Sequence, residues 1–160
     1  MLFCIALIIF LYGLQISKYR IGWNRIKSEN PQAFTPKASI VIAMRNEEKE
    51  VIRLITELKK QIYPTDKLEF ILVNDHSTDA TLELLQQSAM DNLQIVNMPD
   101  GELGKKNAIK KAIALAEGEI ILATDADCSF SSNWVQTMAS YFVDSSIQLV
   151  SGPVVFHKQK

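Results

Sequence analysis

Residues 120–128 read Ile-Ile-Leu-Ala-Thr-Asp-Ala-Asp-Cys, and this stretch decides the fold. A short apolar run that ends in polar turn residues is typical of a buried strand in a parallel sheet. Asp125 and Asp127 follow at its carboxyl end, which is where an open α/β sheet binds ligands. Two carboxylates this close repel each other unless a cation or hydrogen-bond donors lie between them. The stretch therefore predicts a parallel α/β sheet with a metal-bridged phosphate site at its edge.

Strand and helix patterns alternate along the rest of the domain. The predicted strands cover residues 38–43, 68–73, 93–96, 119–123 and 147–150. The predicted helices cover residues 47–62, 78–90, 105–116 and 131–142. Because helices separate successive strands, we expect right-handed crossovers and a mostly parallel sheet with helices on both faces. The predicted fold class is therefore α/β, in three layers.

The buried faces of two helices are predicted from apolar residues at helical spacing. For residues 47–62 these are Val51, Ile52, Ile55, Leu58 and Ile62. For residues 105–116 they are Ile109, Ala112, Ile113 and Leu115 or Ala116. In the helix between them, Asp79 is the expected N-cap.

Length and composition indicate one ordinary domain without a nucleic-acid partner. The chain has 160 residues and a formal net charge of -1, so it lacks the basic excess of a nucleic-acid-binding protein. Cys4 and Cys128 are its two cysteines. Their scarcity indicates a reducing compartment, and no Cys/His cluster has the spacing of a zinc site.

The N-terminal segment is a candidate membrane anchor. Residues 2–16 are almost continuously apolar, and Lys18, Tyr19 and Arg20 follow at once. An aromatic and positively charged flank is typical of the cytoplasmic end of a membrane helix. We therefore predict a transmembrane anchor over residues 1–17, a basic juxtamembrane segment and linker over 18–36, and a domain over 37–160 that faces the cytoplasm. Because the apolar run is slightly short for a bilayer, a buried or interfacial helix stays as the alternative.

Three polar clusters follow successive predicted strands. They are Arg45-Asn46-Glu47-Glu48, Asn74-Asp75-His76-Ser77-Thr78-Asp79 and Asp125-Ala126-Asp127. A parallel sheet brings these strand ends to one edge, so we expect the clusters to converge. The segment 101–106 precedes a helix whose first N–H groups can bind an anion, and its Lys105 adds a cation.

Together these motifs resemble the inverting, nucleotide-sugar-dependent glycosyltransferases of family 2, which have the GT-A fold. The matching segments are residues 38–48, 73–79, 104–108 and 124–127. The resemblance covers about residues 36–156, the nucleotide-binding half of the family domain. It implies metal-dependent transfer of a UDP- or GDP-linked sugar, with inversion, to a saccharide or lipid acceptor. Together with the predicted anchor, this places the expected reaction at the cytoplasmic face of the cell membrane.

The resemblance also implies a role for each matching polar residue. Asp75 reads the base edge, Glu47 contacts the nucleoside, and Lys105 lies near the diphosphate. Asp127 is the direct ligand of Mg²⁺ or Mn²⁺, and Asp125 lies near the ribose and the metal. Simpler readings stay open: the aspartates as turn or capping residues, and Lys105 as a solvated lysine. Glu47 and its neighbour Glu48 are not separated by sequence alone.

An inverting transferase also needs a general base to deprotonate its acceptor. The family resemblance puts this acidic residue downstream of the Asp125-Ala126-Asp127 motif, so we expect it beyond Lys160 and interpret the chain as a fragment. One alternative is a membrane-tethered nucleotide-binding module without catalytic activity. A nucleotidyltransferase is a second alternative, but it needs a glycine-rich loop where residues 44–48 read Met-Arg-Asn-Glu-Glu.

Overall fold

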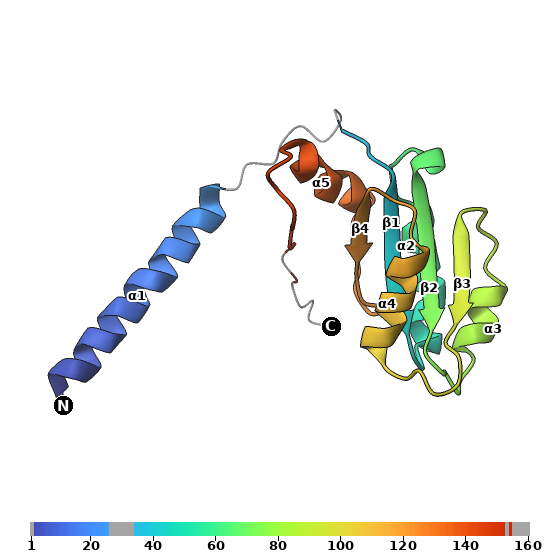
Figure 1. Cartoon of the computed structure of the whole chain (residues 1–160), viewed down its shortest axis with the longest axis horizontal. Helices are drawn as coiled ribbons and strands as arrows, with labels where there is room; N and C mark the ends of the chain where they lie inside the picture. The colour runs from blue at the N-terminus through green and yellow to red at the C-terminus, as the bar shows by residue number, and fades with distance from the viewer. Residues whose placement is uncertain (1, 26–33, 153, 155–160) are drawn as a thin grey trace.

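Four parallel strands form one sheet in the computed structural model, which describes residues 2–25, 34–152 and 154 (Figure 1). The strands are β1 (Ala38–Met44), β2 (Leu68–Asn74), β3 (Leu93–Asn97) and β4 (Ile120–Ala123). Their order across the sheet is β3-β2-β1-β4, and every neighbouring pair is parallel. The predicted α/β class and the first four predicted strands are confirmed.

Helices cover both faces of this sheet, as predicted. The helices that follow the strands are α2 (Glu48–Lys59), α3 (Thr81–Gln86), α4 (Lys105–Leu115) and α5 (Trp134–Ser140), with short 3-10 turns at Thr65–Lys67 and Tyr141–Val143. One buried cluster joins α2, α3 and α5 to the sheet face that carries Ile40 and Phe70. A second joins α4 to the opposite face through Val41 and Ile71. Because β1 and β2 are buried on both faces, their sequences are almost continuously apolar.

Two predicted helix faces are corrected in detail. Ile52 and Ile62 are 69% and 63% exposed, whereas Leu54 is fully buried. The helix ends at Lys59, before Ile62, and its buried stripe is Val51, Leu54, Ile55 and Leu58. In α4, Ala108 and the predicted Ala112 are fully buried, and the predicted Ile109, Leu115 and Ala116 pack partly buried against the same cluster. Only Ile113 departs from the predicted face, because it is 45% exposed. Small alanines let this helix lie close to the sheet.

The strand β4 is only half buried, which also differs from the prediction. Ile120 and Leu122 are buried, but Ile121 is 41% exposed and Ala123 is exposed as well. Ile121 pairs with Ser39 and lies on the sheet face that α4 covers over β1 and β2. The predicted fifth strand over 147–150 is wrong in the described part of the chain, because these residues pair with no strand there and Leu149 is 87% exposed.

A tight contact at the amino end of the sheet fixes the turn into β4. A Cβ on Gly118 would lie 2.6 Å from Ser39 N and 2.9 Å from Ala38 C. Glu69 accepts hydrogen bonds from Gly118 N at 3.1 Å and from the Ser39 hydroxyl. Only glycine allows this approach of the turn to β1, so the register of β4 is set at the end of the sheet farthest from the polar clusters.

The N-terminal segment forms the helix α1 (Leu2–Arg25), which stands apart from the sheet in Figure 1. Its span Cys4–Gly22 is long and apolar enough to cross a membrane, with mean hydropathy 1.4 and no residue buried against the rest of the chain. The helix continues past residue 17 into the predicted juxtamembrane segment. Residues 26–33 of the predicted linker lie outside the described residues.

Candidate functional site

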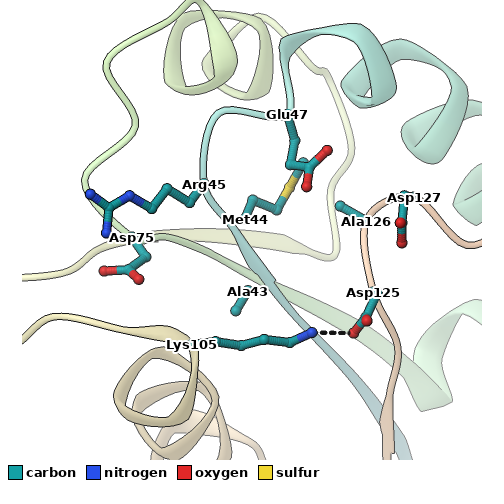
Figure 2. A pocket seen from close by; sticks show the side chains of 9 residues that line it. All are labelled: Ala43, Met44, Arg45, Glu47, Asp75, Lys105, Asp125, Ala126 and Asp127. Atoms are coloured by element: carbon teal, nitrogen blue, oxygen red, sulfur yellow. Dashed lines mark hydrogen bonds and ion pairs between the residues drawn. The ribbon is translucent and has the colours of Figure 1, made fainter.

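A pocket lies at the carboxyl edge of the sheet, where the loops after β1, β2 and β4 meet the start of α4 (Figure 2). It brings together all five predicted site residues: Glu47, Asp75, Lys105, Asp125 and Asp127. Ala43, Met44, Arg45 and Ala126 complete its lining. The convergence expected from parallel strands is therefore confirmed in geometry, while the role of each residue stays a prediction.

The loops after β1 and β2 hold each other in place through polar contacts. Asn46 has a left-handed backbone, with φ at 57°, and its Oδ1 accepts a hydrogen bond from Thr78 N at 2.8 Å. The Asn46 N–H donates to Ser77 Oγ at 3.0 Å. The Glu47 N–H donates to Thr81 Oγ1 at 2.8 Å. These contacts fix the backbone on both sides of the pocket before any ligand arrives.

Asp79 links the same two loops in a way that corrects its predicted role. The helix α3 begins at Thr81 with Ala80 as its N-cap, so Asp79 lies one residue too early. Its Oδ1 accepts from Thr81 N at 3.0 Å, and its Oδ2 accepts from Glu48 N at 3.2 Å. Because Glu48 is the first residue of α2, Asp79 satisfies one of the N–H groups that this helix end leaves unpaired.

Asp75 is a buried carboxylate, 3% exposed, that joins β2 to the start of α4. Its two oxygens accept from Gly104 N at 3.2 and 3.0 Å, and His76 Nδ1 lies 3.0 Å from Oδ1. Burial alone would raise the pKa of the Asp75 carboxyl, but the hydrogen bonds to His76 and Gly104 and the charge of Arg45 bring this pKa below its usual range. Asp75 is therefore held ionised at the edge of the pocket.

The opposite end of the pocket is acidic. Figure 2 shows Glu47, Asp127 and Asp125 on that side, with Arg45 and Asp75 on the other. Burial is the largest cause that raises the pKa of the Glu47 carboxyl, and the negative charge of Asp127 raises it further, followed by the charges of Glu50, Asp79 and Asp125. Glu47 thus lies beside the aspartate pair, at a distance from the predicted nucleoside end near Asp75.

Lys105 forms an ion pair with one carboxylate of this acidic end. Lys105 Nζ lies 2.6 Å from Asp125 Oδ1, and both side chains are more than half exposed, at 60% and 53%. An exposed pair of this kind contributes about 0–1 kcal/mol to stability, so either partner is available to a ligand. The pair joins α4 to the loop after β4 across the mouth of the pocket.

The carboxylates of Asp125 and Asp127 fit a hard divalent cation whose other ligands come from a substrate. Among the described residues, no three acidic, histidine or cysteine side chains converge closely enough to hold a metal ion by themselves. Mg²⁺ and related ions typically use one or two carboxylates together with substrate phosphates and water. Asp125 and Asp127 are exposed and face an excess of negative charge, which such an ion would neutralise.

Arg45 is a pocket residue whose role the sequence did not indicate. Figure 2 shows its guanidinium directed toward Asp75, whose pKa its charge helps to lower. The signal available in the sequence was a single arginine in a cluster of Asn and Glu residues. Because a charge in a polar loop is more often solvated, this signal is weak without the structure.

Comparison with known proteins places the chain among sugar transferases. Residues 39–160 match the family profile described as Glycosyl transferase family 2. The glycosyltransferase AglE of Haloferax volcanii is 31% identical over 123 residues, which are 76% of this chain and 40% of that protein. Beta-monoglucosyldiacylglycerol synthase of Nostoc sp. is 31% identical over 114 residues, which are 69% of this chain and 24% of that protein.

Solved structures share the fold. The mannosyltransferase PcManGT from Pyrobaculum calidifontis, in complex with GDP-Man and Mn²⁺, superposes with a TM-score of 0.75 at 25% identity. The match covers 89% of this chain and 44% of that one. TarS of S. aureus in complex with UDP gives a TM-score of 0.62 at 24% identity, over 77% of this chain and 40% of that one. The chain thus spans less than half the length of these relatives.

Proposed function

Since the chain belongs to glycosyl transferase family 2, we propose that it forms the donor-binding part of a glycosyltransferase that moves a sugar from a nucleotide sugar to an acceptor hydroxyl with inversion. The single observation that carries this proposal is the pocket in Figure 2. It gathers the five predicted residues from the loops after β1, β2 and β4 and from the start of α4, at the edge of a parallel sheet where this fold class binds nucleotides.

The two ends of the pocket suit the two ends of a nucleoside diphosphate. Asp75, held ionised beside Arg45, accepts hydrogen bonds from a nucleobase, because a carboxylate has about four acceptor sites and Gly104 and His76 occupy only part of them. We place the diphosphate at the other end, near Lys105 and the two aspartates. When the diphosphate binds there, the Lys105 ammonium leaves its ion pair with Asp125 and pairs with a phosphate oxygen instead.

Asp127 and Asp125 would hold Mn²⁺ or Mg²⁺ at this diphosphate end. When bound, the ion acts as a Lewis acid that stabilises the leaving nucleoside diphosphate. This part of the proposal is supported by the acidic surroundings of Glu47. It is also supported by the Mn²⁺ and GDP-Man recorded with PcManGT, the similar structure. Glu47 remains a proposed contact to the donor.

A nucleotide screen tests the proposal directly. We expect UDP or GDP to raise the thermal unfolding midpoint of the full chain more in Mn²⁺ or Mg²⁺ than in EDTA, with ADP as the comparison base. A ligand at about 100 times its Kd stabilises the folded state by about 2.7 kcal/mol, which differential scanning fluorimetry detects readily. The proposal fails if none of the nucleotides changes the midpoint in any metal condition.

We also propose that α1 anchors this domain to the cytoplasmic face of the cell membrane, near a lipid or saccharide acceptor. Removal of residues 1–27 is expected to move the protein from the membrane pellet to the supernatant after a carbonate wash. The double substitution Ile8→Lys and Leu11→Lys keeps the full chain length and should release the protein in the same way. Each lysine at the centre of a membrane helix costs about 3 kcal/mol of insertion free energy. Retention of either variant in the pellet would argue against the anchor.

A further inference from the structure

Arg53, in the middle of α2, contacts the backbone on both sides of Asp127. Its Nη2 donates to the carbonyl oxygen of Ala126 at 2.8 Å. Its Nη1 donates to the carbonyl oxygen of Cys128 at 3.0 Å and to Ser129 Oγ at 2.9 Å. One side chain from a rigid helix thus fixes the residues immediately before and after the proposed metal ligand.

Arg53 is itself held in a defined orientation. Its Nε donates to Glu50 Oε2 at 2.8 Å, and its Nη1 lies 3.2 Å from Glu57 Oε2. The side chains of Arg53, Glu50 and Glu57 are only 30%, 33% and 21% exposed. A planar guanidinium with donors on three nitrogens can satisfy this set of acceptors at once, which the single ammonium of a lysine cannot do.

The same face of α2 docks the rest of the segment that follows Asp127. Glu57 Oε2 accepts from Phe130 N at 3.2 Å. Gln61, two residues past the end of α2, donates to Ser131 O at 2.9 Å and accepts from Val135 N at 3.2 Å. Arg53 is the member of this row nearest the pocket, so its contacts decide where the docked segment begins.

The loop that carries Asp127 has little regular structure of its own. Residues 124–130 belong to no helix or strand, and a turn contact joins Cys128 N to Asp125 O at 3.3 Å. The side chains of Asp125 and Asp127 are exposed at the mouth of the pocket. Orientation of Asp127 therefore depends on what holds the neighbouring peptide groups, and Arg53 holds both.

We propose that Arg53 is a positioning residue that orients the Asp127 carboxylate toward the metal and its diphosphate. In this role Arg53 itself contacts neither the metal nor the diphosphate. The inference rests on the proposed function, since it assigns Arg53 to the metal-dependent part of donor binding. Loss of an outer partner of this kind typically lowers metal affinity by about 10- to 100-fold. A purely architectural arginine would instead change stability and leave the effect of the metal on nucleotide affinity unaltered.

The first measurement is the gain in nucleotide affinity that Mn²⁺ provides. GDP and UDP are titrated calorimetrically into the full chain, each with Mn²⁺ and with EDTA. In Arg53→Gln we expect this gain to fall by about tenfold, while affinity in EDTA changes less than about twofold. Arg53→Lys should be intermediate, because it keeps the charge and one of the contacts. Lys59→Gln, which removes an exposed charge from the same helix, is the matched control and should behave as wild type.

A second measurement reports on the loop without nucleotide or metal. Cys128 is partly buried in the held segment, and Cys4→Ser removes the other thiol. In this background Arg53→Gln should speed the labelling of Cys128 by a soluble thiol reagent by about tenfold, because the loop opens more often. Lys59→Gln should leave the rate unchanged. Circular dichroism melts show whether each variant is folded at the labelling temperature.

The results separate this inference from the proposed function. If Mn²⁺ increases nucleotide affinity as much in Arg53→Gln as in the wild type, the positioning role is overturned and donor binding stays intact. The same conclusion follows if the rate of Cys128 labelling is unchanged in Arg53→Gln. No Mn²⁺ gain in the wild type overturns the proposed metal use, and the inference built on it falls with it. A reduced gain together with faster labelling supports the inference.

Discussion

Asp127→Ala is expected to abolish the Mn²⁺-dependent part of nucleoside diphosphate binding while leaving the fold intact. The side chain is exposed at the mouth of the pocket, so its truncation creates no cavity in the core. Loss of a direct ligand should lower affinity in Mn²⁺ by about 100-fold or more, since even outer partners of a metal site are worth about 10- to 100-fold. Isothermal titration of GDP and UDP, in Mn²⁺ and in EDTA, measures both affinities.

Affinity in EDTA should change little in Asp127→Ala, because the metal-free complex does not use this carboxylate. Asp91→Ala is the matched control: it removes an exposed aspartate from the turn before β3, outside the pocket lining. Unchanged Mn²⁺-dependent affinity in Asp127→Ala would refute the assignment of this residue as a metal ligand.

Asp75→Asn is expected to give the complementary pattern, with weaker nucleotide binding whether or not the metal is present. Hydrogen bonds to a charged group are worth about 1.5–3 kcal/mol, which corresponds to a loss of about 10- to 100-fold in affinity. The same titrations measure this loss, and Asp91→Asn serves as the control. Equal losses in Mn²⁺ and in EDTA would place Asp75 at the nucleoside end, apart from the metal.

The pH dependence of stability tests the second role of Asp75, its contact with the start of α4. Its pKa is lower in the folded chain than the value of about 3.9 expected when unfolded. The ionised carboxylate therefore stabilises the fold fully above that unfolded value, and the contribution is lost as pH falls through the folded pKa. Urea unfolding should show Asp75→Asn less stable than wild type at pH 7, with the difference shrinking below about pH 4. Normal nucleotide affinity with reduced stability would mean that Asp75 serves the fold alone.

The sheet and the position of the site were predictable because both depend on local pattern and chain order. Apolar runs flanked by polar turns gave β1, β2, β3 and β4 within a residue or so at each end. Parallel pairing then dictates that residues after successive strands meet at one edge. For this reason Glu47, Asp75 and Asp127 could be expected in one pocket although the chain separates them widely.

The errors arose where exposure depends on neighbours distant in sequence. Ile121 has the same apolar character as Leu122, but α4 packs over β1 and β2, and Ile121 is left 41% exposed. Residues 147–150 have strand-like composition, yet a strand needs a hydrogen-bonding partner and none is present among the described residues. Apolar composition indicates what can be buried and does not identify the element that covers it.

The contacts of Arg53 were beyond prediction for a related reason. In the sequence it follows Glu50 and precedes Glu57 at helical spacing, which is the usual pattern of a solvated helix surface. Only the tertiary fold brings the carbonyl groups of Ala126 and Cys128 within reach of its guanidinium. Every residue has a backbone carbonyl group, so the sequence does not show which carbonyls an arginine contacts. In the sequence, an arginine that holds a loop through its carbonyl groups therefore looks like any surface arginine.

The strand order β3-β2-β1-β4 has a consequence for how the chain acquires its structure during synthesis. The strand made first, β1, lies inside the sheet: its Ala38 pairs with Leu68 on one side and with Ile120 on the other. As the ribosome proceeds from the N-terminus, β1 can pair with β2 early, while its other edge waits for β4. Asp125 and Asp127 emerge only after β4. The end of the pocket at Asp75 is thus assembled first, and the end at Asp125 and Asp127 is completed last.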